Sequence, residues 1–207
     1  MPLLFILSTD LLFKDIRNFK GPTYLEMDHH SVQVIPSVHQ TLDEMDFERG
    51  IWTSALMGDI TKVRDHLRKG VNVDVEDNNG YTALHYASRN GHHRICNILL
   101  DAGASVDKCT HAGGATALHR AAMSGHSDTC ELLLHYGANL LARDVDGRTP
   151  LHRAVEQGQK DVIALFLKAM PASAFEKDNK GRNPLDYAED KETISPLFSN
   201  IDCKTLQ

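Results

Sequence analysis

Short apolar blocks alternate with polar, glycine-containing turns over most of the chain. In the block that begins at Thr149, Leu151 and Ala154 lie three positions apart, which places them on one face of a short helix. Thr149 can act as the N-cap, and Pro150 takes the first helical position, where its missing N–H is harmless. The next block, residues 162–167, is apolar around much of a helical circumference, so it predicts a second helix enclosed by neighbours. The pattern therefore predicts an all-α protein built from helix pairs.

The same pattern recurs along the chain as an internal repeat. Four segments share the form Gly-x-x-x-Leu-x-x-Ala and begin at Gly80, Gly114, Gly147 and Gly181, which are 34, 33 and 34 residues apart. Turn sequences that end on these glycines, such as Asp-Asn-Asn-Gly at 77–80, separate the helix pairs because glycine permits positive φ. A degenerate copy lies 33 residues upstream and begins at Ile51. The chain is therefore a repeat array with an amino-terminal capping copy.

A period of 33 residues that carries Thr-Ala-Leu-His or Thr-Pro-Leu-His resembles the ankyrin repeat. The resemblance implies an all-α repeat solenoid of paired antiparallel helices with β-turn fingers. It also implies binding to other proteins through the finger tips and the concave surface of the first helices. We divide the repeat domain, residues 51–190, into a first, capping unit (51–79), three full units (80–113, 114–146 and 147–180) and a truncated fifth unit (181–190) that keeps only its first helix.

Three segments fall outside this register. Residues 38–50 form a pre-repeat segment, and residues 191–207 are expected to be a C-terminal tail. Residues 1–37 have mixed polarity and contain Pro22 and Pro36, so we expect a poorly ordered leader that adds no packing to the solenoid.

Composition narrows the function classes. The chain has 207 residues, a formal net charge of −6 and a hydrophobic content of 42%. The acidic balance argues against a nucleic-acid binder, and the apolar residues are too dispersed for a membrane protein. Four cysteines are too few and too unevenly spaced for a disulfide framework, which favours an intracellular, cytoplasmic or nuclear, protein. We expect a monomer that binds other proteins.

No motif for a catalytic nucleophile, a phosphate loop or a dinucleotide site is present in the sequence, so we expect no enzyme and no cofactor. His85, His119 and His152 recur three residues after the capping threonine, which predicts hydrogen bonds between imidazole and hydroxyl. The group His92, His93 and Cys96 has spacings that zinc sites use, but Cys96 aligns with apolar core positions. A zinc-binding protein is therefore the weakest functional hypothesis.

The binding surface is predicted from repeat position. The candidate residues share a place at a finger or on the exposed side of a first helix: Asn78, Asn79, Tyr81, Tyr86, Arg89, Asn90, Arg120, Met123, Ser124, Asp146, Arg148, Arg153, Glu156 and Gln157.

Among these residues, Arg89, Arg120 and Arg153 lie on consecutive first helices and are expected to form a row along the concavity. Such a row could bind carboxylates of a partner, or it could be neutralised internally by Asp146 and Glu156. The favoured function is a non-catalytic protein-interaction module or adaptor. A substrate receptor of a ubiquitin ligase is the alternative.

Overall fold

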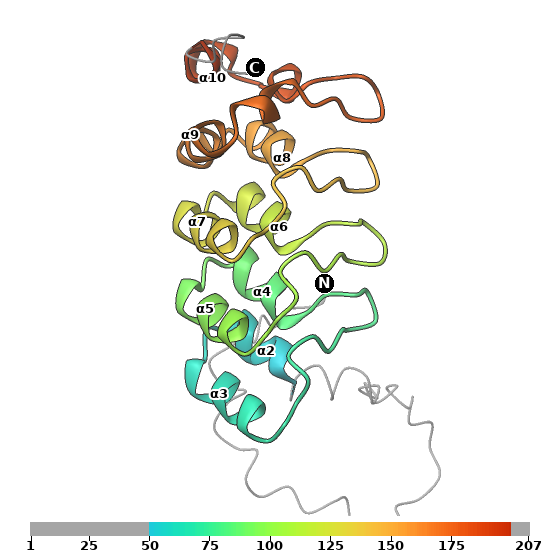
Figure 1. Ribbon diagram of the computed structural model, residues 1–207, viewed down its shortest axis with the longest axis vertical. Helices are drawn as coiled ribbons and strands as arrows, with labels where there is room; N and C mark the ends of the chain where they lie inside the picture. The colour runs from blue at the N-terminus through green and yellow to red at the C-terminus, as the bar shows by residue number, and fades with distance from the viewer. Residues whose placement is uncertain (1–49, 200–207) are drawn as a thin grey trace, which may run out of the picture. The chain divides into compact units, whose positions relative to one another are not determined.

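The protein is a stack of helix pairs joined by long turns. The computed structural model describes residues 50–199, so the expected leader and nearly all of the pre-repeat segment lie outside the described residues. Within residues 50–199 there are nine α-helices, two 3₁₀ helices and no strand. In Figure 1 the first helices of successive units lie one above another, the second helices form a parallel layer beside them, and the turns project to the opposite side. The predicted all-α repeat solenoid is confirmed.

The helix bounds follow the repeat register. The first helices are α2 (Ile51–Leu56), α4 (Ala83–Arg89), α6 (Ala117–Ser124) and α8 (Pro150–Glu156). The second helices are α3 (Ile60–Arg68), α5 (His93–Asp101), α7 (Ser127–His135) and α9 (Lys160–Ala169). A 3₁₀ helix, η3 (Pro171–Phe175), follows α9, and the last unit contains the 3₁₀ helix η4 (Pro184–Tyr187) and α10 (Lys191–Phe198).

Threonine and histidine together start three of the first helices. Thr82, Thr116 and Thr149 are the N-caps of α4, α6 and α8, and each forms a capping box with the histidine three residues later. The capping box satisfies backbone donors that a helix N-terminus otherwise leaves unpaired. Pro150 occupies the first turn of α8, as predicted.

Glycine ends the first helix where the next unit comes close. Gly91 has φ 68°, in the left-handed region that favours glycine. A Cβ atom there would lie 2.5 Å from Nδ1 of His126 in the following unit. The chain reversal and the close stacking therefore both require glycine at this position.

The core is continuous along the stack. Val63, Cys96, Cys130 and Ile163 occupy equivalent positions in the second helices and are fully buried. Leu118 is also fully buried, in α6. Each of these side chains belongs to one connected apolar cluster that runs from Ile51 to Ile194. The predicted register and core positions are therefore correct.

The C-terminal unit is longer than the sequence register suggested. Helix α10 covers residues 191–198 and packs against α9, so the prediction of a C-terminal tail is wrong for these residues. Ile194 is 2% exposed and belongs to the core cluster. The fifth unit thus has two helical segments. Helix α10 supplies an apolar core side chain although its sequence lacks the consecutive leucines of α5 and α7.

Candidate protein-interaction surface

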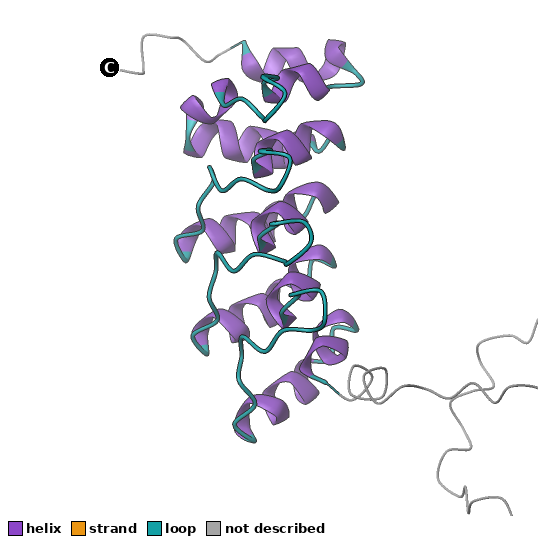
Figure 2. Ribbon diagram, turned by 90° about the vertical axis from the view of Figure 1, so that its right-hand side faces the viewer, coloured by secondary structure: helices purple, strands orange, loops and turns teal. Residues whose placement is uncertain are grey.

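The fingers and the first helices form one face of the stack. Figure 2 views this side and shows the turns one below another in front of the helices. A backbone hydrogen bond links each finger to the next: His111 N donates to Asn79 O (3.0 Å), Val145 N to Gly113 O (3.1 Å) and Asn179 N to Asp146 O (3.0 Å). These bonds hold the finger tips in register, so side chains at equivalent positions keep a regular spacing.

The predicted binding residues divide by exposure. The most exposed lie at the finger tips and at the ends of the first helices: Asn78, Asn79, Arg89, Asn90, Asp146 and Gln157. The half-buried residues lie at the finger bases and along the first helices: Tyr81, Tyr86, Arg120, Met123, Ser124, Arg148, Arg153 and Glu156. The first group is available to a partner without rearrangement.

Arg153 is neutralised within the protein. Its guanidinium pairs with Asp144, with Asp146 (3.2 Å) and with Glu156 (3.1 Å). Asp144 is nearly inaccessible, since its side chain is 1% exposed. Although burial acts to lower it, hydrogen bonds and charge attraction from Asp144 and Glu156 hold the pKa of Arg153 above its ordinary value. Of the two alternatives for the arginine row, internal neutralisation therefore describes Arg153.

Arg120 has a different environment. Its Nη2 donates to the hydroxyl of Tyr81, and its guanidinium carbon lies 4.9 Å from the centroid of the Tyr81 ring. No carboxylate of the described residues forms an ion pair with it. The Nε of Arg120 is buried and has no hydrogen-bond partner within residues 50–199. The three arginines of the expected row thus do not share one electrostatic role.

A third arginine cluster was missed by the sequence analysis. Tyr187 lies under the guanidinium groups of Arg148 and Arg182, whose central carbons are 4.5 and 4.2 Å from the ring centroid. Its hydroxyl donates to the buried carboxylate of Asp178. Although burial acts to raise it, hydrogen bonds from Tyr187 and from backbone amides hold the pKa of the Asp178 carboxyl below its ordinary value. The signal that could have found this cluster is the aspartate that starts the turn sequences at 77, 144 and 178.

Histidines join neighbouring units instead of forming a reactive site. Nε2 of His85, His119 and His152 donates to a carbonyl of the next unit: Ala115 O at 3.1 Å, Arg148 O at 3.0 Å and Arg182 O at 3.2 Å. Burial lowers the pKa of all three, and that of His85 to about 4. The predicted bonds to the threonine hydroxyls are also present, at 2.9 to 3.0 Å.

A second series of side chains reaches back to the preceding unit. The N-cap residues of α5, α7 and α9 bond to the end of the preceding first helix: His92 to Leu56 O, His126 to Arg89 O and Gln159 to Met123 O. Because His92 is used in this way and Cys96 is buried in the core, the two do not converge on a metal site. Within the part of the chain that the structure describes, no group of three or more His, Cys, Asp or Glu residues could hold a metal ion.

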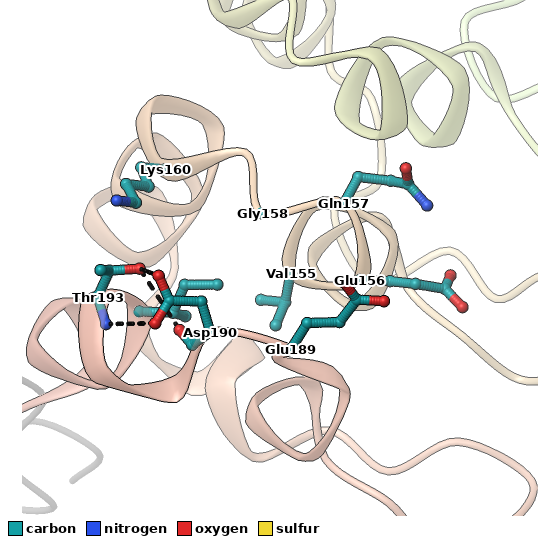
Figure 3. Close-up of a pocket in the computed structure, with 9 residues that line it drawn as sticks. Val155, Glu156, Gln157, Gly158, Lys160, Glu189, Asp190 and Thr193 are labelled. Atoms are coloured by element: carbon teal, nitrogen blue, oxygen red, sulfur yellow. Dashed lines mark hydrogen bonds between the residues drawn. The ribbon is translucent and has the colours of Figure 1, made fainter.

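The contact between the last two units of the stack (the last joint) differs from the contacts between the other units. Asp190 takes the N-cap position of α10, and its carboxylate accepts hydrogen bonds from the amide (3.3 Å) and hydroxyl (2.7 Å) of Thr193. A carboxylate cannot donate to a carbonyl, so no bridge corresponds to that of His92, His126 or Gln159. A pocket of about 290 Å³ lies at this place. Val155, Asp190 and Thr193 are among the residues that line it (Figure 3).

Among the helices of residues 50–199, none is long and apolar enough to cross a membrane.

Comparison with protein families identifies the repeat. The family model described as ankyrin repeats in three copies matches residues 51–144, and the model for a single ankyrin repeat matches residues 146–179. The chain belongs to the ankyrin repeat family. Ankyrin repeats are protein–protein interaction modules that use extended surfaces of the stack.

Relatives of the ankyrin repeat family share part of the sequence. Human ankyrin repeat domain-containing protein 39 is 55% identical over 74 residues, which are 36% of this chain and 40% of the relative. The protein of the same name from Bos taurus is 62% identical over 58 residues, which are 28% of this chain and 32% of the relative. The aligned part thus spans less than half of either relative.

Proposed function

We propose that this ankyrin repeat protein is a non-catalytic adaptor that binds partner proteins through the finger tips and the exposed side of its first helices. The observation that carries the proposal is the regular ladder of fingers, in which one backbone hydrogen bond joins each tip to the next. A ladder of this kind presents polar side chains such as Asn79 and Asp146 on a rigid frame. Binding then requires little ordering of the protein itself, which favours affinity.

The cysteines and the charge support the setting that we propose for this adaptor. Cys96, Cys109 and Cys130 are free thiols, as suits a reducing cytoplasmic or nuclear compartment. The net charge of −6 favours a protein partner over nucleic acid. We also propose that the protein is a monomer.

The proposal is tested by mutating opposite faces of the stack. Partners captured by the full chain would be identified, expressed separately and measured for direct binding. A front variant carries Asn79→Ala, Met123→Ala and Gln157→Ala, and a back variant carries Glu131→Ala and Asp161→Ala on α7 and α9. We expect the front variant to lose at least tenfold in affinity while the back variant binds like the unmodified protein. Equal loss in both variants, or catalytic turnover of a bound partner, would contradict the proposal.

A further inference from the structure

An acidic residue at the base of a finger pairs with the first helix that follows that finger at three places in the stack. Asp77 accepts a hydrogen bond from Tyr86 (2.7 Å), Asp144 from Arg153 (2.8 Å) and Asp178 from Tyr187. The three donors occupy equivalent positions on α4, α8 and η4. The finger that precedes each of these first helices therefore supplies a carboxylate to the exposed side of that helix.

The finger that precedes α6 breaks this rule. Thr110 takes the place of the aspartate, because its amide bonds to Ala115 O (3.0 Å) as the amide of Asp144 bonds to Arg148 O (3.0 Å). Arg120 takes the place of Arg153. Thr110 is 3% exposed and its hydroxyl accepts from the amide of Ala115, so it offers Arg120 no negative charge. Arg120 is thus a cation without the finger carboxylate that pairs with the equivalent residue on α4, α8 and η4.

The guanidinium of Arg120 is nevertheless held in place. It lies over the ring of Tyr81 and donates to its hydroxyl. Tyr81 is itself packed against Tyr86 and His85, with ring centroids 5.4 and 5.7 Å apart. A guanidinium that is already oriented loses little conformational entropy when it binds a ligand. Its Nη1 makes no hydrogen bond to any described residue, which leaves a donor for an incoming acceptor, whereas its Nε is buried.

The neighbourhood of Arg120 favours a single carboxylate over a polyanion. Arg153, on the next first helix, is already paired with three carboxylates and adds no free positive charge. Asp77, on the preceding finger, is engaged by Tyr86 and by the amides of Asn79 and Tyr81 and forms no ion pair with Arg120. Glutamate or aspartate side chains bind guanidinium in a planar, charge-assisted geometry.

We propose that Arg120 binds the side-chain carboxylate of a glutamate or aspartate in a partner's peptide segment. The partner's carboxylate then pairs with Arg120 as the protein's own Asp144 pairs with Arg153. This inference rests on the proposed function, since it specifies one contact on the same surface. It names acidic peptide segments as the class of ligand, and it makes Arg120 the residue that selects them.

The test selects ligands without knowledge of the natural partner. Random 12-residue peptides displayed on phage are selected on the full chain, and the recovered sequences are synthesised with each acidic residue intact or replaced by its amide. We expect one acidic position whose replacement weakens binding at least tenfold. The same replacement should have less than a twofold effect on Arg120→Gln, because the group that it pairs with is gone.

A second variant removes the site without altering Arg120. Thr110→Asp places a carboxylate where Asp144 stands in the next finger, so Arg120 becomes neutralised internally. We expect this variant to keep its melting midpoint and to lose the acid-dependent binding. Arg94→Gln is the matched control, because Arg94 is an exposed arginine on α5, in the layer of second helices, and should leave the acid-dependent binding unchanged.

The possible failures are distinguishable. Selected peptides that lack a critical acidic residue, or whose acid matters equally in Arg120→Gln, overturn the inference and leave the proposed function standing. Dependence on a free C-terminal carboxylate in place of a side chain also overturns it. Absence of any selected peptide from this surface counts against both the inference and the proposed function.

Discussion

Nε of Arg153 donates to a carboxylate oxygen of Asp144 at 2.8 Å, and the Asp144 side chain is 1% exposed. The carboxylate also accepts from the amides of Asp146 and Arg148, both at 2.9 Å, so it organises the finger from within. Arg153 is therefore part of the fold and not a free contact for a partner.

Removing this arginine should destabilise the protein. Arg153→Met leaves the buried charge of Asp144 with only backbone donors, and we expect a loss of about 1 to 3 kcal/mol in the free energy of unfolding. Urea denaturation measures this loss. Arg89→Met is the control and should change stability by less than about 0.5 kcal/mol. Equal effects of the two substitutions would show that the Asp144 contact contributes nothing.

Leu118 tests the core register. The side chain is fully buried in α6, between neighbouring units, so Leu118→Ala removes packed methyl groups and leaves a cavity. We expect a cost of about 2 to 5 kcal/mol, measured by urea denaturation. Val145→Ala at a finger tip, where Val145 is 61% exposed, should cost far less. A cost below about 1 kcal/mol for Leu118→Ala would be inconsistent with a continuous core.

The buried histidines predict acid sensitivity. The pKa of His85 is about 4 in the folded protein and 6.5 in the unfolded chain, so the unfolded chain binds more protons between these values. The contribution of His85 is complete above pH 6.5 and is lost as the pH falls towards 4. Between pH 7.5 and pH 5, His85 alone should account for about 2 kcal/mol of lost stability.

Denaturation curves at the two pH values test this. The stability difference between pH 7.5 and pH 5 should shrink by about that amount in His85→Gln. It should not change in His93→Gln, where the side chain is exposed. An unchanged difference in His85→Gln would mean that His85 accepts a proton in the folded state.

Helix α10 should stabilise the end of the stack. Ile194→Ala removes a side chain that is 2% exposed and is expected to cost about 2 to 5 kcal/mol. Lys191→Ala, on the same helix but exposed, is the control. Calorimetric melting compares them. If both variants melt like the unmodified protein, residues 191–198 act as a tail after all.

Thiol reactivity should follow burial. Burial raises the pKa of Cys96 to about 11 and also raises that of Cys130, whereas Cys109 is exposed. Since the thiolate is the reactive form, iodoacetamide should label Cys109 in the native protein and should label the other two only in denaturant. Peptide mass mapping measures each site. Native labelling of Cys96 would contradict its place in the core.

The fold could be predicted from the sequence because its pattern repeats. Features that depart from the repeat could not be predicted in the same way. The Thr-x-x-His capping, the core alignment of Cys96 with Cys130 and the helix pairs all recur, so each copy supports the others. Helix α10 does not repeat the earlier pattern, because its polar start at Asp190 and its internal Pro196 hide its relation to the other second helices. The roles of Arg120 and Arg153 were not separable from the sequence, since their difference depends on whether Thr110 or Asp144 lies beside them in space.

Three of the four contacts between neighbouring units of residues 51–198 carry their own spectroscopic reporter. The amide of Thr116 donates to Nδ1 of His119 (3.2 Å), and Nε2 faces a carbonyl of the next unit, so the ring must be the neutral tautomer with its proton on Nε2. His85 and His152 are in the same state at their own joints. When a joint opens, its Nε2 meets water and the tautomer is no longer fixed. Nitrogen NMR of the imidazoles can therefore follow the separation of individual neighbours, one resonance per joint, without any added label that perturbs the packing.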